Sequence, residues 1–168
     1  MRAAQAEARI EALIPNLRRY ARALTGDPAG ADDLVQDCVE RALSRLHLWR
    51  QDGDMRAWLF AIMRNIWRND LRQRARRPGT VALDETIEPG VPPAQGDRLD
   101  LRDMQAALLA LAEEQREVVL LVGLEGLSYA EAARVTGVPL GTVMSRLKRG
   151  RDRLAALTAG EAPIRRVK

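Results

Sequence analysis

Arginine side chains recur at helical spacing near the end of the printed sequence, where they could contact phosphates or the edges of bases. In the stretch PLGTVMSRLKRGRDRL, residues 139–154, one helix face carries Thr142, Arg146, Arg149 and Arg153. The adjoining stripe, which we expect to pack, carries Val143, Leu147, Gly150 and Leu154. Guanidinium groups match guanine and phosphate, and hydroxyls contact several bases, so this face is suited to nucleic acid.

A capped helix and a short turn precede this basic stretch. In SYAEAARVTG, residues 128–137, Ser128 stands at the N-cap and Glu131 follows three residues later, which predicts a capping box. Gly137 is expected to end that helix. Helix, short turn and second helix form a helix-turn-helix, whose second helix lies in the major groove. A solvated basic surface helix is the alternative, and the combined signals favour DNA binding.

A second set of arginines is expected on a long helix over residues 55–77. Arg64, Arg68 and Arg72 are four residues apart, with Asn65 beside them, and an apolar arc lies opposite. Arginines near a helix C-terminus are favourable in any protein, so a core helix with a solvated rim is the simpler interpretation. The spacing favours phosphate contact.

An acidic face is expected on a helix over residues 30–47. Asp33, Asp37 and Glu40 share this face, and Gln36 lies at its side. We place Asp32 and Asp33 in the first turn, where the helix dipole alone accounts for them. Asp37 and Glu40 lie beyond that turn. Because an acidic face repels DNA, it is expected to meet water or a basic protein.

The elements that position these faces are all predicted to be helices. Apolar residues recur at spacings of three and four, and alternating β-branched runs are absent, so we expect an all-α fold. Residues 78–98 are rich in proline, glycine and acidic residues, which predicts a flexible acidic linker. We therefore expect two small helical domains, residues 5–77 and 99–157, and a frayed tail at 158–168.

Composition excludes several classes of protein. The chain of 168 residues has a formal charge of +4, one cysteine, Cys38, and one histidine, His47, which rules out a disulfide framework or a structural zinc site. No apolar run approaches a membrane span. We find no phosphate-binding glycine loop, metal cluster or nucleophile–base pair, and so expect no catalytic residue, metal or cofactor. A soluble, cytoplasmic, non-enzymatic protein is predicted.

Together these features resemble bacterial RNA polymerase sigma factors of the extracytoplasmic-function (ECF) type, the compact group with only regions 2 and 4. DDLVQDCVERAL, residues 32–43, resembles region 2.2, and residues 55–74 resemble regions 2.3 and 2.4. Residues 108–154 are similar to region 4 nearly throughout. The resemblance spans about residues 8–157. Two motif blocks in this order are specific to this family, whereas a helix-turn-helix alone occurs in many other proteins.

The resemblance implies a role for each face. Region 2 would bind the clamp helices of the polymerase β′ subunit through Asp33, Gln36, Asp37 and Glu40. Region 2 would also engage the −10 element and its melted strand through a specificity loop, Leu48–Asp54, and the following helix. The −10 residues would be Trp49, Arg50, Gln51, Asp52, Arg64, Asn65, Arg68 and Arg72.

Region 4 would contact the polymerase β flap and read the −35 element of double-stranded promoter DNA. The residues implied are Thr142, Ser145, Arg146, Arg149 and Arg153. Many members carry a basic residue where Met144 stands, so a contact is lost or replaced here. The acidic linker matches the family segment that passes through the polymerase near the RNA path.

The resulting hypothesis is a sigma factor that directs the polymerase core to promoters, is monomeric when free, and is controlled by an anti-sigma factor. One alternative is a sigma-like mimic that sequesters an anti-sigma factor. Such mimics carry a fused receiver domain, for which 168 residues leave no room, and the retained arginines also argue against them. A dimeric activator would not need the region 2 block.

Overall fold

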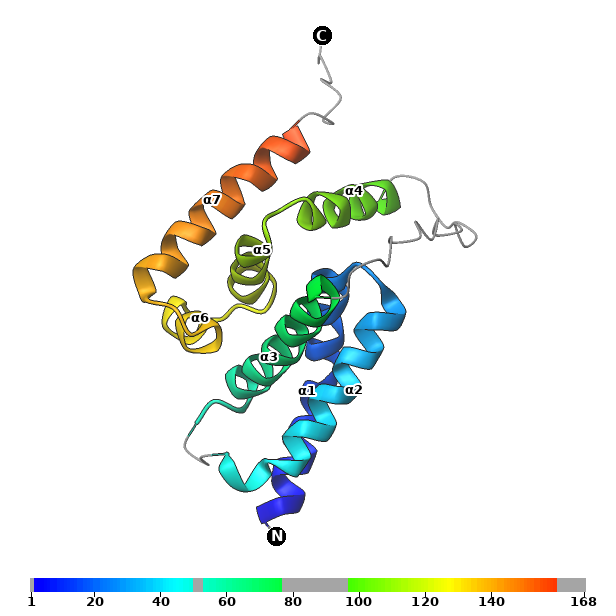
Figure 1. Cartoon of the computed structure of the whole chain (residues 1–168), viewed down its shortest axis with the longest axis vertical. Coiled ribbons are helices and arrows are strands. Elements are labelled where there is room, and N and C mark those ends of the chain that lie inside the picture. Colours follow the sequence, from blue (N-terminus) through cyan, green and yellow to red (C-terminus); the bar gives the residue numbers. More distant parts are fainter. Residues whose placement is uncertain (1, 50–52, 77–96, 160–168) are drawn as a thin grey trace.

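The computed structural model describes residues 2–49, 53–76 and 97–159, and every regular element in these ranges is helical (Figure 1). The first block contains α1 (Arg2–Thr25), α2 (Pro28–Ser44), a short 3-10 turn (Leu46–Leu48) and α3 (Met55–Arg76). The second contains α4 (Asp97–Leu109), α5 (Glu113–Val119), a π turn (Leu120–Leu124), α6 (Tyr129–Thr136) and α7 (Leu140–Ala159). The predicted all-α fold is confirmed.

The first block is a three-helix bundle around a buried apolar core. Leu17, Leu24, Leu59 and Phe60 are at most 1% exposed. The Tyr20 ring meets the Phe60 ring edge-on, with centroids 5.0 Å apart. Each side chain of this size contributes about 1.5–3 kcal/mol when it leaves water, so this core holds α3 in place.

The start of α2 differs from the sequence-based expectation. The helix begins at Pro28, and the Asp27 carboxylate caps it by accepting hydrogen bonds from the amides of Ala29 (3.2 Å) and Gly30 (2.9 Å). Asp32 therefore lies beyond the first turn, as does Asp33, and placing them in that turn was wrong. Asp32 instead forms an ion pair with Arg18, at 3.4 Å.

The helix-turn-helix has the local signals that the sequence predicts. The Ser128 hydroxyl accepts from the Glu131 amide (3.2 Å), and the Glu131 carboxylate accepts from the Ser128 amide (2.7 Å). Gly137 ends α6 at φ 68°, a conformation that glycine adopts without strain. On α7, Val143 and Leu147 are buried as expected. The capping box and the packing stripe of α7 are confirmed.

Helix α5 continues into the π turn, in which the Glu125 amide donates to the Leu120 carbonyl at 3.0 Å. Two boundaries in the second block differ from expectation. Helix α7 continues to Ala159, into the expected tail. Helix α4 already begins at Asp97, so it includes the end of the expected linker, whose preceding residues lie outside the described ranges.

The two blocks pack against each other, an arrangement that the sequence does not predict. Helix α6 lies beside α3 (Figure 1). Helix α1 contacts both α4 and the π turn. None of the helices in the described ranges is long and apolar enough to span a bilayer.

Candidate nucleic-acid interface

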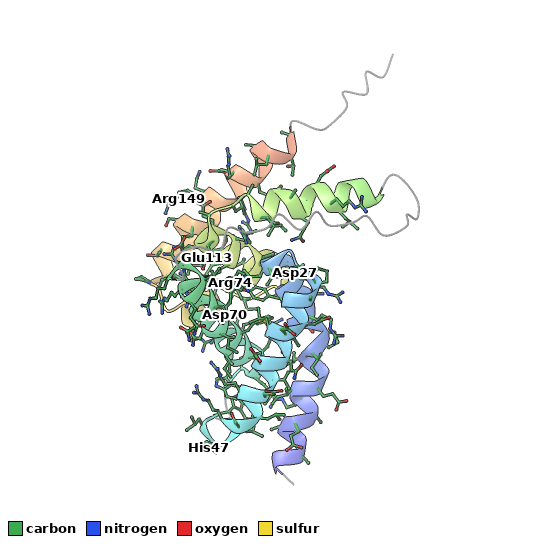
Figure 2. The ribbon with its side chains drawn as sticks, turned by 45° about the vertical axis from the view of Figure 1, so that its right-hand side comes forward. Asp27, His47, Asp70, Arg74, Glu113 and Arg149 are labelled. Carbon is green, nitrogen blue, oxygen red and sulfur yellow. The ribbon has the colours of Figure 1, made fainter. Side chains whose placement is uncertain are left out.

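The outer face of α7 presents the predicted reading residues to solvent. Ser145, Arg149 and Arg153 are exposed, whereas Thr142 and Arg146 are half-buried. Arg149 donates from Nε to the Ser145 carbonyl (3.3 Å) and from Nη2 to the Ser145 hydroxyl (3.4 Å). These contacts hold the guanidinium near the N-terminal half of the helix. Figure 2 shows Arg149 far from His47, which lies beside the predicted specificity loop.

The predicted −10 face on α3 is divided in this structure. Asn65 and Arg72 are exposed, but Arg64 and Arg68 face the second block, with side chains 13% and 22% exposed. Nε of Arg64 lies 3.2 Å from Oε2 of Glu117, and Nε of Arg68 lies 3.2 Å from Oε1 of Glu117. The side chain of Glu117 is fully buried. Helix α5 therefore occupies the arginine face proposed for DNA.

Physical chemistry explains why Glu117 is tolerated inside the contact. A buried carboxylate is costly unless charged partners satisfy both oxygens, and here each oxygen accepts from one guanidinium. Glu113 and Glu114 also lie near Arg68, at 3.6 Å and 3.5 Å. Burial raises the pKa of Glu113, and the nearby guanidinium of Arg68 opposes that effect. The contact is an acidic cluster on α5 facing a basic pair on α3.

A second contact between the blocks is centred on Glu125. Its buried carboxylate accepts from Arg19 through both oxygens, at 3.0 Å each, and from the Asn16 amide at 3.1 Å. This bidentate geometry is the strong form of an arginine–carboxylate pair. The hydrogen bond to Glu125 raises the pKa of Arg19. The backbone of Glu125 also accepts from Arg56, at 3.0 Å.

A third contact joins the C-terminus of α1 to the second block. The Arg116 guanidinium donates to the Leu24 carbonyl of α1 (2.9 Å), and to the carbonyls of Leu108 (2.9 Å) and Leu109 (2.8 Å) at the end of α4. Cations are favourable at helix C-termini, where carbonyls lack partners. Burial lowers the pKa of Arg116.

Glu117 and Glu125 make buried contacts between the blocks that were not predicted from the sequence. They are the two acids in the otherwise apolar run EVVLLVGLEGL, residues 117–127. An isolated acid at a position expected to be buried indicates a buried ion pair, because the charge must be compensated there. The partners were not predictable, since they lie in the other block.

The acidic face of α2 is present and accessible. Asp33, Gln36, Asp37 and Glu40 are all exposed, and the Gln36 amide donates to the Glu40 carboxylate at 3.0 Å. On the opposite side, Cys38 is buried, its thiol donates to the Leu59 carbonyl (3.4 Å), and burial raises its pKa to about 12. A thiol with that pKa is unreactive at neutral pH.

The predicted specificity loop is only partly described. Trp49 is half-buried, and the Arg9 guanidinium stacks over its ring, 5.2 Å from the centroid. Arg50, Gln51 and Asp52 lie outside the described residues. Within the described part of the chain, His, Cys, Asp and Glu side chains form no group that could hold a metal ion.

Known proteins share this arrangement of a helical bundle and a helix-turn-helix. The family model for region 4 of sigma-70 matches residues 101–154, and the model for the Sigma2 domain of PhyR matches residues 10–64. The ECF RNA polymerase sigma factor EcfG of Rhodopseudomonas palustris is 40% identical over 88% of this chain and 82% of its own length. This chain belongs to the ECF sigma factor family. The predicted family is thus confirmed, and its members are non-enzymatic transcription factors.

Solved structures agree with this assignment. The sigma factor resembles RpoE of Bartonella quintana, solved in complex with the anti-sigma factor NepR, with a TM-score of 0.77, 34% identity, and coverage of 92% of this chain and 97% of RpoE. It also resembles CnrH, solved with the cytosolic domain of CnrY, with a TM-score of 0.70, 28% identity, and coverage of 95% and 96%.

Proposed function

We propose that this sigma factor directs the RNA polymerase core to specific promoters in the cytoplasm, helps open the −10 region and performs no catalysis itself. The observation that carries the proposal is the outer face of α7. It exposes Ser145, Arg149 and Arg153 on a helix whose other side is buried in the second block. A helix-turn-helix places such a face in the major groove, here against the −35 element.

The acidic face of α2 is the proposed contact with the β′ clamp helices. Asp33, Asp37 and Glu40 are exposed, and the chain as a whole carries a charge of +4. A cluster of acids on a basic protein is suited to a basic protein partner and repels DNA. This surface is accessible while the two blocks are packed together, so core binding could precede any separation of the blocks.

The proposed −10 surface requires a change in the arrangement of the blocks. Arg64 and Arg68 currently satisfy Glu117, and a guanidinium that contacts a phosphate must leave that carboxylate. Asn65 and Arg72 are exposed and would contact DNA without such a change. Trp49 would supply a ring on which an unstacked base is held.

Anti-sigma control is proposed from two relatives. RpoE of B. quintana was solved in complex with the anti-sigma factor NepR. CnrH was solved in complex with the cytosolic domain of CnrY. We propose that this chain is likewise held inactive by an anti-sigma factor. The second candidate is a mimic that binds an anti-sigma factor without touching promoters, which the match of residues 10–64 to the PhyR domain favours. The exposed arginines of α7 and the similarity to EcfG favour the sigma factor.

Run-off transcription with purified core polymerase on a genomic library tests the proposal. Promoter-selective transcripts that depend on this chain support a sigma factor. A chain that binds an anti-sigma factor but yields no such transcripts is a mimic.

The core-binding face is tested in the same system. Asp37→Lys with Glu40→Lys is expected to lower the affinity for core while circular dichroism shows unchanged helicity. The matched control, Glu7→Lys with Glu11→Lys, makes the same charge change on exposed positions of α1 and is expected to bind core normally. Unchanged core affinity of the α2 variant would refute the assignment.

A further inference from the structure

An open, partly apolar groove lies between the start of α6 and the N-terminal half of α7. Tyr129 and Met144 form its apolar walls, Gly141 lies between them, and Ser145, Lys148 and Arg151 line the polar side. On α7, Met144 and Lys148 are one helical turn apart, on the flank of the buried stripe away from Arg146 and Arg153.

Both apolar walls are far more exposed than the residues that pack α7. Met144 is 50% exposed and Tyr129 is 40% exposed, whereas Val143 and Leu147, which pack α7, are at most 3% exposed. Covering an exposed apolar side chain with a partner removes it from water, which lowers the free energy. Methionine is flexible and polarizable, so it adapts to a small apolar group.

The surroundings of the groove favour DNA as its occupant. Ser145 lines it together with Lys148 and Arg151. The exposed Arg149 donates to the Ser145 hydroxyl at 3.4 Å and so lies next to this edge of the groove. Its acid, Asp152, is neutralised by Lys148 at 2.7 Å. A Cβ atom at Gly141 would meet nothing within 4 Å, so a flat base edge can approach the backbone there.

The major groove presents one apolar group, the 5-methyl group of thymine, which only A·T pairs carry. We propose that Met144, supported by Tyr129, is a specificity-determining residue that receives a thymine methyl group of the −35 element. Ser145 and Arg149 make the neighbouring polar contacts. This inference rests on the proposed function, because it assumes that α7 enters the major groove.

Replacing thymine by uracil removes that methyl group and nothing else. A −35 element is first selected from random duplexes by holoenzyme assembled from core polymerase and the full chain. Each thymine of the selected element is then replaced by uracil, one position at a time, and holoenzyme binding is measured by competition. The wild type is expected to lose about fourfold in affinity at one position, the effect of exposing one buried methyl group.

The protein variants assign that loss to the groove. Met144→Ala holoenzyme is expected to bind the thymine and uracil duplexes equally at that position. The matched control is Leu140→Ala, because Leu140 is 49% exposed on the same helix but does not line the groove. This variant is expected to keep the fourfold preference. Both substitutions are on the surface, so the fold is retained.

Several outcomes overturn the inference. They are a selected element without an A·T pair, uracil substitutions that are all neutral, and a thymine preference that survives in Met144→Ala. If Met144→Ala instead weakens binding to core polymerase and leaves thymine discrimination intact, the groove is a protein-binding surface. Failure of the holoenzyme to select any duplex refutes the proposed function itself, whereas selection without thymine discrimination refutes only the role of Met144.

Discussion

Arg64 of α3 donates a hydrogen bond to Glu117 of α5 across the boundary between the two blocks, with Nε and Oε2 3.2 Å apart. Arg68 donates a hydrogen bond to the other carboxylate oxygen of Glu117, Oε1, also at 3.2 Å. Glu117 therefore occupies the position proposed for a phosphate on this arginine pair. The chain in this arrangement can present α7 and the acidic face of α2, but Arg64 and Arg68 of α3 are already engaged.

Replacing Glu117 by glutamine is expected to favour separation of the blocks. The amide keeps the shape but loses the charge, so it cannot compensate two guanidinium groups. Charge-assisted hydrogen bonds contribute about 1.5–3 kcal/mol each, so the balance between closed and open forms should shift by about tenfold or more. Small-angle scattering should show a larger radius of gyration, and the free chain should bind a single-stranded −10 oligonucleotide more tightly.

The control for this experiment is Glu114→Gln. Glu114 lies 3.5 Å from Arg68 but is 44% exposed, so removing its charge is expected to change little, as for other surface pairs. If Glu117→Gln leaves both the scattering and the oligonucleotide affinity unchanged, the contact does not restrict access to α3.

Arg146→Ala tests how the half-buried arginine of α7 meets DNA. If Arg146 reads a base, holoenzyme binding to the cognate −35 element should weaken by about 1–3 kcal/mol and binding to mismatched duplexes should change less. If Arg146 contacts a phosphate, all sequences should weaken alike and the salt slope should fall by about 1. Arg102→Ala, on the exposed face of α4, serves as the control. Unaltered promoter binding would exclude both roles.

The capping box of α6 predicts a pH-dependent contribution to stability. Hydrogen bonds from the Ser128 side chain and backbone lower the pKa of Glu131 from its usual value of 4.5. An acid with a lowered folded-state pKa stabilises the fold above its unfolded-state pKa and loses this contribution as pH falls through the folded-state value. Glutamine can keep the capping hydrogen bond but loses the charge near the helix N-terminus, so Glu131→Gln should be less stable than wild type at pH 7 by about 0.3–1 kcal/mol. The difference should shrink below about pH 4.5.

Urea unfolding of both proteins across that pH range measures the difference. Ser128→Ala removes the main partner of Glu131, so the glutamine substitution should have a smaller effect in that background. A stability difference that stays constant from neutral to acid pH would argue against the capping role.

Gly150 is predicted to be required for the packing of α7 on α5. A Cβ atom at this position would lie 2.7 Å from Cγ2 of Val119, a short and stiff side chain. Overpacking costs about 1–3 kcal/mol, more than the roughly 1 kcal/mol by which alanine surpasses glycine in a helix. Gly150→Ala should therefore lower the melting temperature. Gly141→Ala on the same helix meets no atom within 4 Å and should not destabilise the fold. Equal melting temperatures for the two variants would contradict this account.

Local features of the sequence were enough to predict most of the helices. The buried stripe of Val143 and Leu147 follows from the periodicity of apolar residues, and Ser128, Glu131 and Gly137 determine the ends of α6 through contacts within one turn. The start of α2 was predicted too late, although a local signal for it is present. Asp27 followed by Pro28 is a typical helix start, yet the apolar pattern of α2 becomes clear only from Leu34, which led to a late boundary.

The two-block organisation, the helices and the cationic and acidic faces were determined by the sequence itself, because periodicity and capping act over a few neighbouring residues. Only the tertiary structure decided which residues of the other block lie against each of these helix faces. Arg64 and Arg68 are on one face of α3 whether they meet phosphate or carboxylate, and their partner Glu117 is 53 and 49 residues away. Arg19 and Glu125 are 106 residues apart. Such pairs form only when two separately patterned blocks dock, so no local pattern identifies them, and the docking decides which arginines remain exposed.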